Sequence, residues 1–424
     1  MKKLNAFVPH SARRLDMPSF ASLNTFCFSS LSLKRTLLSL SLLASAHASA
    51  SGIFLQEAVI ANAGTVGAGD GVYTQSAAAM WANPATMPWM GETLTTVNAT
   101  AFDLKMDYHD QSGVGHGQAA SLMPSVGLFH VRQLNEDVHF GIALGTVGGS
   151  SLDYGSEWQG AALMTDIALA AVQINPALGF KVTDQLSWGI GAQISWASLE
   201  MGMANARRLE QSSDWAYGFN AGVMYRVSER WNLGASFRSK VNHEFSTELS
   251  GGQRALPVGT DLVVPAIVDV SSSYAVNPKL KLLASIQLHR WSEWDETVFD
   301  FGRVDSNPLG LNSIDRQWED VWKMAIGTDY QLNADWRLKA GFSYESSPQD
   351  DPSKQWVDLP VGQQYRYSVG ATTQWDSYVL DVYYEYADLG EVDIAPRKIA
   401  NQDVGISGAF EGRIHFVGLS VSFK

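Results

Sequence analysis

Apolar and polar residues alternate along most of the chain beyond Gly91. In residues 186–196 one face carries Trp188, Ile190 and Trp196, and the other carries small or polar residues such as Gln193. Successive side chains of a β-strand point to opposite faces, so this period of two predicts a strand with one apolar face. A tryptophan near each end of that face is typical of a strand that crosses a membrane, because aromatic side chains gather at both interfaces.

The same pattern recurs in strand-length segments down to the end of the chain. It predicts fourteen strands, at residues 92–105, 120–132, 137–147, 165–182, 186–201, 213–227, 230–246, 264–276, 279–295, 318–330, 335–345, 364–374, 377–387 and 411–423. An even number is the rule for single-chain bacterial barrels. A soluble sandwich would carry fewer aromatic residues at its strand ends. The sequence therefore predicts an all-β fold, a transmembrane antiparallel β-barrel.

The connections between the predicted strands alternate between short and long. Short ones lie near Glu229, Asn277, Asn333 and Ser377, and long ones cover residues 148–164, 247–263, 297–317, 346–363 and 389–410. Outer-membrane barrels have short periplasmic turns and longer extracellular loops, so this alternation favours the same fold.

Residues 1–50 are typical of an export signal. Lys34 and Arg35 precede an apolar segment at 36–46, and the small residues up to Ala50 fit a cleavage site. We expect cleavage after Ala50, and the sequence leaves open whether translation starts at Met1 or further along. The single cysteine lies within this segment, so the exported chain has no disulfide and no thiolate site.

Composition and motifs exclude several functions. The formal charge of −13 argues against a nucleic-acid partner, because phosphates repel an acidic surface. No apolar run reaches the roughly eighteen residues of a membrane-spanning helix. No histidine, cysteine or carboxylate motif has the spacing of a metal or catalytic site, so we expect no metal, no cofactor and no enzyme activity.

Basic residues on the predicted polar faces allow two interpretations. Residues such as Arg238, Lys323 and Arg366 would either meet an anionic solute or pair with acidic residues such as Glu345 and Glu385. We expect pairing for most of them, because a polar lumen needs balanced charge whatever the solute. The sequence does not indicate which basic residue would meet a carboxylate.

Three stretches carry a resemblance to a known family. Residues 51–87 have a Gly-Ala-rich middle and an Asn-Pro-Ala sequence, residues 154–182 contain a tryptophan and an Asn-Pro, and residues 364–390 precede the closing strand. The chain thereby resembles the FadL-like family of outer-membrane transporters for long-chain fatty acids and other hydrophobic compounds. The resemblance implies a fourteen-stranded barrel plugged by a small hatch, with a signal at 1–50, the hatch at 51–91 and the barrel at 92–424.

The resemblance also implies a set of site residues. Those that contact the substrate would be Ile53, Phe54 and Leu55 in the pocket, and Trp158, Leu163 and Met164 at an outer capture site. The hatch motif would comprise Trp81, Asn83, Pro84 and Ala85, and glycines would kink the third strand beside a lateral opening, at Gly141, Gly145, Gly148 and Gly149.

The implied function is passive uptake across the outer membrane of a Gram-negative bacterium. Loops would capture the solute, which would pass the hatch and leave sideways through the barrel wall. Long-chain fatty acids are the first expectation; uptake of aromatic or alkane hydrocarbons, a porin for small polar solutes, a lipid-acting barrel enzyme and an adhesin or phage receptor stay open. The expected partners are hydrophobic small molecules, outer-membrane lipid and lipopolysaccharide, and the barrel-assembly machinery, with a monomeric protein and no nucleic acid.

Overall fold

The computed structural model describes residues 57–302, 309–375, 377–399 and 402–424. The predicted signal segment lies outside these residues. So do Ile53, Phe54 and Leu55, which the resemblance places in the pocket. No helix in the described part of the chain is long and apolar enough to span a membrane.

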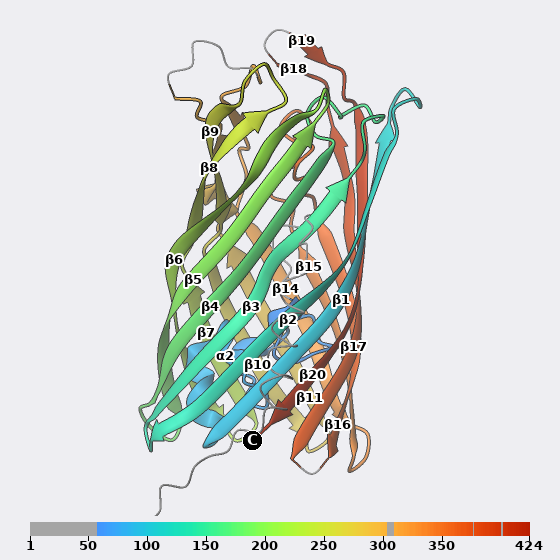
Figure 1. Ribbon diagram of the computed structural model, residues 1–424. Helices are drawn as coiled ribbons and strands as arrows, with labels where there is room; N and C mark the ends of the chain where they lie inside the picture. The colour runs from blue at the N-terminus through green and yellow to red at the C-terminus, as the bar shows by residue number, and fades with distance from the viewer. Residues whose placement is uncertain (1–56, 303–308, 376, 400–401) are drawn as a thin grey trace, which may run out of the picture. The chain divides into compact units, whose positions relative to one another are not determined.

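Fourteen antiparallel strands form a closed barrel, as predicted (Figure 1). They are β1 (Thr93–Asp110), β2 (Gly117–Asn135), β3 (Val138–Asp153), β4 (Asp166–Lys181), β5 (Leu186–Met203), β6 (Arg207–Ser228), β7 (Trp231–Arg238), β10 (Ile267–Asn277), β11 (Leu280–His289), β14 (Val321–Gln331), β15 (Trp336–Glu345), β16 (Gln364–Trp375), β17 (Tyr378–Ile394) and β20 (Gly408–Phe423). Each strand pairs with the next one in this order, and β20 pairs with β1 from Phe423 opposite Thr95 to Gly408 opposite Asp110. The barrel therefore closes on itself between its first and last strands.

One predicted strand, 230–246, is wrong as a single element. The chain leaves the wall after Arg238, and β8 (Val241–Ser250) forms a separate hairpin with β9 (Leu256–Val264). Ser239 ends the wall segment, because its hydroxyl accepts the amide of Phe219 at 2.9 Å in place of a ladder carbonyl. Two short hairpins also occupy predicted loops: β12 (Glu296–Val298) with β13 (Ser313–Asp315), and β18 (Arg397–Ile399) with β19 (Gln402–Val404).

The two faces of the strands differ as the alternation predicts. On β5, Trp188 and Ile190 are exposed, whereas Ser187, Gln193 and Ser195 are buried inside the barrel. The exposed band of aromatic and aliphatic side chains matches what a lipid environment requires, and the polar residues face the lumen.

Residues 57–91, called the hatch below, fold inside the barrel as short helical turns (Figure 1, blue). These are η1 (Glu57–Val59), η2 (Asp70–Val72), α2 (Ala79–Ala82) and η3 (Pro84–Trp89). The Asn83 side chain caps η3 by accepting the amide of Ala85 at 3.0 Å, and Pro84 takes the first helical position, where no amide is needed. This turn explains why the segment does not continue as a strand.

Candidate functional site

Neutral hydrogen bonds attach the body of the hatch to the wall. Asn98 of β1 donates to the carbonyls of Ala58 and Ile60, both at 3.0 Å, and Ser236 of β7 donates to the carbonyl of Ala82 at 2.7 Å. The Asn83 amide reaches the Val223 carbonyl of β6 at 3.0 Å. Because buried carbonyls are costly to leave unpaired, these contacts fix the hatch to three strands of the wall, β1 and the neighbouring pair β6 and β7.

Arg238 makes a further contact between the wall and the hatch. Its partners differ from the acidic ones that we predicted for most basic residues of the lumen. Its guanidinium donates to the Trp81 carbonyl at 2.8 Å, to Asn175 at 3.2 Å, to Gln193 at 2.8 Å and to Gln173. All four acceptors are neutral, and the guanidinium also lies 4.6 Å from the centre of the Trp81 ring. Arg238 thus connects the Trp81 carbonyl of the hatch to three amide side chains of β4 and β5.

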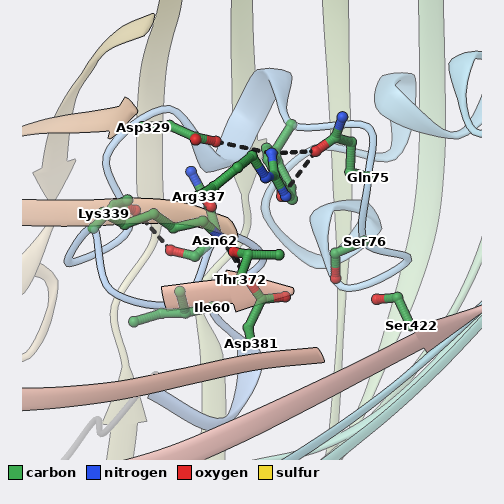
Figure 2. Close-up of polar contacts among 12 residues, drawn as sticks. Ile60, Asn62, Gln75, Ser76, Asp329, Arg337, Lys339, Thr372, Asp381 and Ser422 are labelled. Atoms are coloured by element: carbon green, nitrogen blue, oxygen red, sulfur yellow. Dashed lines mark hydrogen bonds and ion pairs between the residues drawn. The ribbon is translucent and has the colours of Figure 1, made fainter. Parts of the chain in front are cut away.

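Ion pairs neutralise the lumen at the end that carries the short turns. Figure 2 shows Arg337 between Gln75 of the hatch, at 2.6 Å, and Asp329, at 3.0 Å. Lys339 lies 2.6 Å from Asp381 with its side chain fully buried. These pairs follow the expected charge balance. A cavity of about 860 Å³ opens on this side, and Gln75, Trp89 and Met90 of the hatch contribute to its lining.

Two much smaller cavities lie on the other side of the hatch. The inner cavity, of about 50 Å³, is lined by hatch residues such as Val59, Val66 and Trp81. The outer cavity, of about 70 Å³, is lined by loop and wall residues such as Trp291 and Leu359. Each has room for a few water molecules but not for a long acyl chain. Glu57 and Lys323 line both cavities, so they mark the constriction between them.

A group of buried and half-buried charges surrounds this constriction, and we call it the Arg366 cluster. It consists of Glu57, Lys323, Glu345, Arg366 and Glu385. Arg366 of β16 donates to the carboxylate of Glu57 and lies 3.6 Å from Glu385. Lys323 stands opposite Glu345 in the register of β14 and β15, and within the described part of the chain it forms no ion pair within 4.0 Å. The cluster thus holds three carboxylates and two cations.

The ladder between β2 and β3 stops partway along the wall. Backbone pairing ends where Gly127 faces Gly145, although both strands continue toward the long loops. Beyond that point the described contacts across the split are polar and sparse, such as the Ser151 amide 3.5 Å from the Ser121 hydroxyl. The carbonyl of Ala58 lies against Gly127, so the hatch reaches the start of the split.

The four glycines predicted to kink β3 fall into two groups. Gly148 and Gly149 follow a bulge in the pairing with β4, where the register shifts between Thr146 and Gly148. Gly141 and Gly145 lie beneath the hatch, and a Cβ on either would come within 2.5 Å of Met87 or Val59. These two glycines give the hatch room, and their part in a lateral opening stays a prediction.

The residues predicted for outer capture form part of an apolar loop region. Leu163 lines a cavity of about 100 Å³ together with Met203, Phe299 and Trp356. Trp158 is buried behind it, where its ring stacks on Tyr154 at 4.7 Å. The Trp158 indole also donates to the carbonyl of Met164 at 2.9 Å, and Met164 is itself fully buried. Of the three, Leu163 alone lines this cavity.

Comparison with known proteins identifies the barrel. Residues 41–424 match the family model of the outer membrane protein transport proteins (OMPP1/FadL/TodX). The chain belongs to this family. Its alignment with a long-chain fatty acid transport protein of Escherichia coli is 20% identical and covers 78% of this chain and 85% of that protein.

Solved structures show the same fold. A FadL homologue of Pseudomonas aeruginosa superposes with a TM-score of 0.78 at 19% identity, covering 88% of this chain and 99% of that one. The Pseudomonas putida toluene transporter TodX gives a TM-score of 0.63 at 16% identity, covering 86% and 99%. Members of the FadL/TodX family are outer-membrane channels for hydrophobic compounds, so this protein is an outer-membrane protein of that kind.

The barrel also contains one constellation that the sequence did not reveal. Ser195 of β5 lies 3.0 Å from His243 of β8, whose other ring nitrogen lies 3.5 Å from Asp214 of β6. Serine, histidine and aspartate in this order resemble a catalytic triad, but Ser195 and His243 have no exposed surface. No substrate carbonyl reaches the hydroxyl in this arrangement. The three side chains join the β8 hairpin to the wall, in keeping with a family of channels.

Buried charge also occurs within the hatch. Both carboxylate oxygens of Asp70 accept backbone amides, from Ala61 at 2.7 Å and Asn62 at 3.1 Å. Burial nevertheless raises the pKa of Asp70 to about 6. No motif in the sequence indicates this contact, because Asp70 accepts backbone amides and these are present at every residue except proline.

Proposed function

We propose that the protein takes up long-chain hydrophobic carboxylates, fatty acids first, by passive lateral diffusion. Solute would enter through the apolar loop cavity beside Leu163, pass to the constriction at Glu57 and Lys323, and leave between β2 and β3. Residues 51–91 would act as the hatch and 92–424 as the channel, after cleavage of the signal segment.

The observation that carries the proposal is the combination of a fixed hatch and an interrupted wall. Hydrogen bonds from three strands of the wall hold the hatch body, which favours a route that does not require its removal. The β2–β3 ladder ends beside Ala58, next to the constriction. An acyl chain gains about 0.8 kcal/mol for each CH₂ group that it buries in hydrocarbon, so a sideways exit is favourable and an aqueous one is not.

Basic side chains at the constriction favour an acid over a neutral hydrocarbon. Lys323 lines both cavities and Arg366 lines the outer one, so an entering carboxylate would meet a cation there. Similarity to a fatty acid transport protein supports the same substrate class. Uptake of aromatic hydrocarbons is the second candidate, supported by the likeness to a toluene transporter.

A disulfide across the split tests the route. Because the exported chain has no cysteine, Ser121→Cys with Ser151→Cys introduces a single pair across the split. In cells without a fatty acid channel of their own, oxidation should abolish oleate uptake, and reduction should restore it. A matched pair within the continuous ladder, His130→Cys with Ile142→Cys, should leave uptake unchanged in both states.

Other outcomes would contradict the proposal. Unchanged uptake with the Ser121 and Ser151 positions cross-linked would exclude the lateral route. Large, steady ion currents of the wild-type protein in planar bilayers would instead indicate a porin for polar solutes.

A further inference from the structure

Two acidic side chains of the Arg366 cluster meet at one guanidinium nitrogen. Nη1 of Arg366 contacts the carboxylate of Glu57 and lies 3.6 Å from Oε1 of Glu385. The side chains of Glu57 and Glu385 are almost completely buried, with exposed fractions of 5% and 1%. Two carboxyl groups that meet in a site shielded from water resist ionising together, so the pair retains a proton.

Hydrogen bonding places this proton on Glu385. Among the described residues, neither carboxyl oxygen of Glu385 has a hydrogen-bond donor, whereas one oxygen of Glu57 receives a hydrogen bond from Arg366. An ionised carboxylate without donors is costly in a buried site, and protonation removes its charge. The composition of the cluster agrees, because its described members include three carboxyl groups and two cations.

The surroundings of Glu385 can stabilise it after it has lost the proton. Titratable and charged side chains approach it from four elements, and they are Glu57 of the hatch, Lys323 of β14, Arg366 of β16 and Tyr383 of β17. Across the ladder on β20 it faces Phe416, which carries no charge. Glu345 and His289 line the outer cavity together with Lys323 and Arg366. The two cations therefore lie where they would balance an ionised Glu385.

We propose that Glu385 donates its proton to the carboxylate of the solute, which arrives as an anion and leaves through the wall as a neutral acid. This inference rests on the proposed function and adds the chemical step between entry and exit. The O–H bond of Glu385 breaks, an O–H bond forms on the solute, and Glu385 becomes a carboxylate beside Arg366. A proton from water in the inner cavity, which Glu385 lines, then restores the carboxyl group. Each acid that passes thus carries one proton with it.

The exit between β2 and β3 gives this step its purpose. An ionised carboxylate in hydrocarbon costs far more free energy than a neutral carboxyl group. Lys323 and Arg366 would attract the anion to the constriction, and the same attraction would hold it there. Protonation removes the charge on which that attraction depends, so a bound anion becomes a solute that enters lipid.

Infrared difference spectroscopy of the purified full-length protein in detergent tests the proton transfer. Palmitic acid with an isotopic label at its carboxyl carbon separates the C=O band of the solute from those of the protein. We expect binding to produce the band of the protonated, labelled acid and to remove a protonated carboxyl band of the protein. Labelled palmitic acid in the same detergent at the same pH is the reference.

Matched variants assign the spectral changes to one residue. Glu385→Gln has no carboxyl group at this position, so it should lack the protein band and leave the labelled solute ionised. Glu411→Gln, at an exposed carboxylate of β20, should give the spectra of wild type.

Uptake by cells without a fatty acid channel of their own gives a second readout. Hexadecyl sulfonate, whose head group stays ionised, should bind to the protein but should not be taken up. Glu385→Gln should still bind palmitic acid in equilibrium dialysis and should take it up about a hundredfold more slowly, as expected when a positioned proton donor is lost. Glu385→Asp retains a carboxyl group and should recover part of the rate.

The outcomes separate the proton transfer from the transport function. If palmitic acid binds to the wild-type protein and its labelled carboxyl group stays ionised, the transfer is wrong and fatty acid uptake stands. Uptake of the sulfonate at the rate of palmitic acid would also refute it, because the sulfonate crosses without a proton. Identical spectra and uptake for Glu385→Gln and wild type would exclude Glu385 as the donor. If palmitic acid neither binds nor is taken up, the proposed function itself fails.

Discussion

Gly189 of β5 provides the most direct test of how tightly the hatch fits the wall. A Cβ at this position would lie 2.6 Å from the Pro84 carbonyl carbon and 2.8 Å from the Ala85 amide nitrogen. Carbon atoms prefer separations of about 3.5 to 4.0 Å, so the hatch backbone would have to move by roughly 1 Å. That backbone cannot move freely, because Ser187 holds the Ala85 carbonyl at 2.6 Å. Overpacking of this kind costs about 1–3 kcal/mol.

Gly141→Ala is the matched control for Gly189→Ala. Its Cβ would meet the thioether atoms of Met87 and Met80, at 2.5 Å and 2.7 Å from the nearest atom of each. Methionine side chains rearrange easily, so this variant should cost less than about 1.5 kcal/mol. Both substitutions add one methyl group to a wall strand beneath the hatch, and they differ in whether backbone or a flexible side chain must yield.

Ion conductance in planar bilayers measures the outcome. We expect Gly189→Ala to show frequent channel openings as the hatch loosens, while wild type and Gly141→Ala stay closed. Far-UV circular dichroism should show the same β content in all three, since the wall does not depend on this contact. If Gly189→Ala showed no more channel openings than wild type, the reasoning would be refuted. That result would mean that the hatch backbone is not packed against β5 in the membrane.

Three further predictions concern the hatch, the lumen and the loops. Because burial raises the pKa of Asp70 to about 6, the folded hatch binds a proton more tightly than the unfolded chain, and its stability should rise by roughly 2 kcal/mol as the pH falls from 7 to 4; Asp70→Asn should remove this dependence from hatch hydrogen exchange corrected for intrinsic rates. Lys339→Met should cost about 3–5 kcal/mol in urea unfolding by leaving Asp381 unpaired, and Lys339→Met with Asp381→Leu should recover much of that loss. Trp158→Ala should cost about 3–5 kcal/mol of loop packing and make residues 154–165 sensitive to protease, whereas equal digestion of wild type and variant would contradict a structural role.

The sequence predicts the wall well because each strand lies between lipid and the lumen. These two environments constrain the side chains of alternate residues. Lipid requires apolar side chains outside, the lumen accepts small and polar ones inside, and the period of two therefore survives in each strand. The same period misleads at residues 230–246, because β8 is also a half-buried strand. Alternation cannot distinguish a wall strand from a hairpin that leaves the wall at Ser239.

The contacts inside the barrel could not be predicted in the same way. Arg238 meets Gln173, Asn175 and Gln193 because the stagger of β4, β5 and β7 brings these side chains to one level. Stagger depends on closure of the whole barrel and leaves no local signal in the sequence. The fit of Gly189 to Pro84 likewise joins residues far apart in the chain, and the glycine alone indicates only that space is needed.

The neutral hydrogen bonds of the hatch body limit what a solute can move. A carboxylate that displaced a neutral donor such as Asn98 would leave the Ala58 carbonyl buried without a partner, and this costs about 1–3 kcal/mol for each group. Ser236, which donates to the Ala82 carbonyl, adds the same cost on another part of the wall. A route that passes beside the hatch body avoids both costs, and the interruption between β2 and β3 lies where such a route would run.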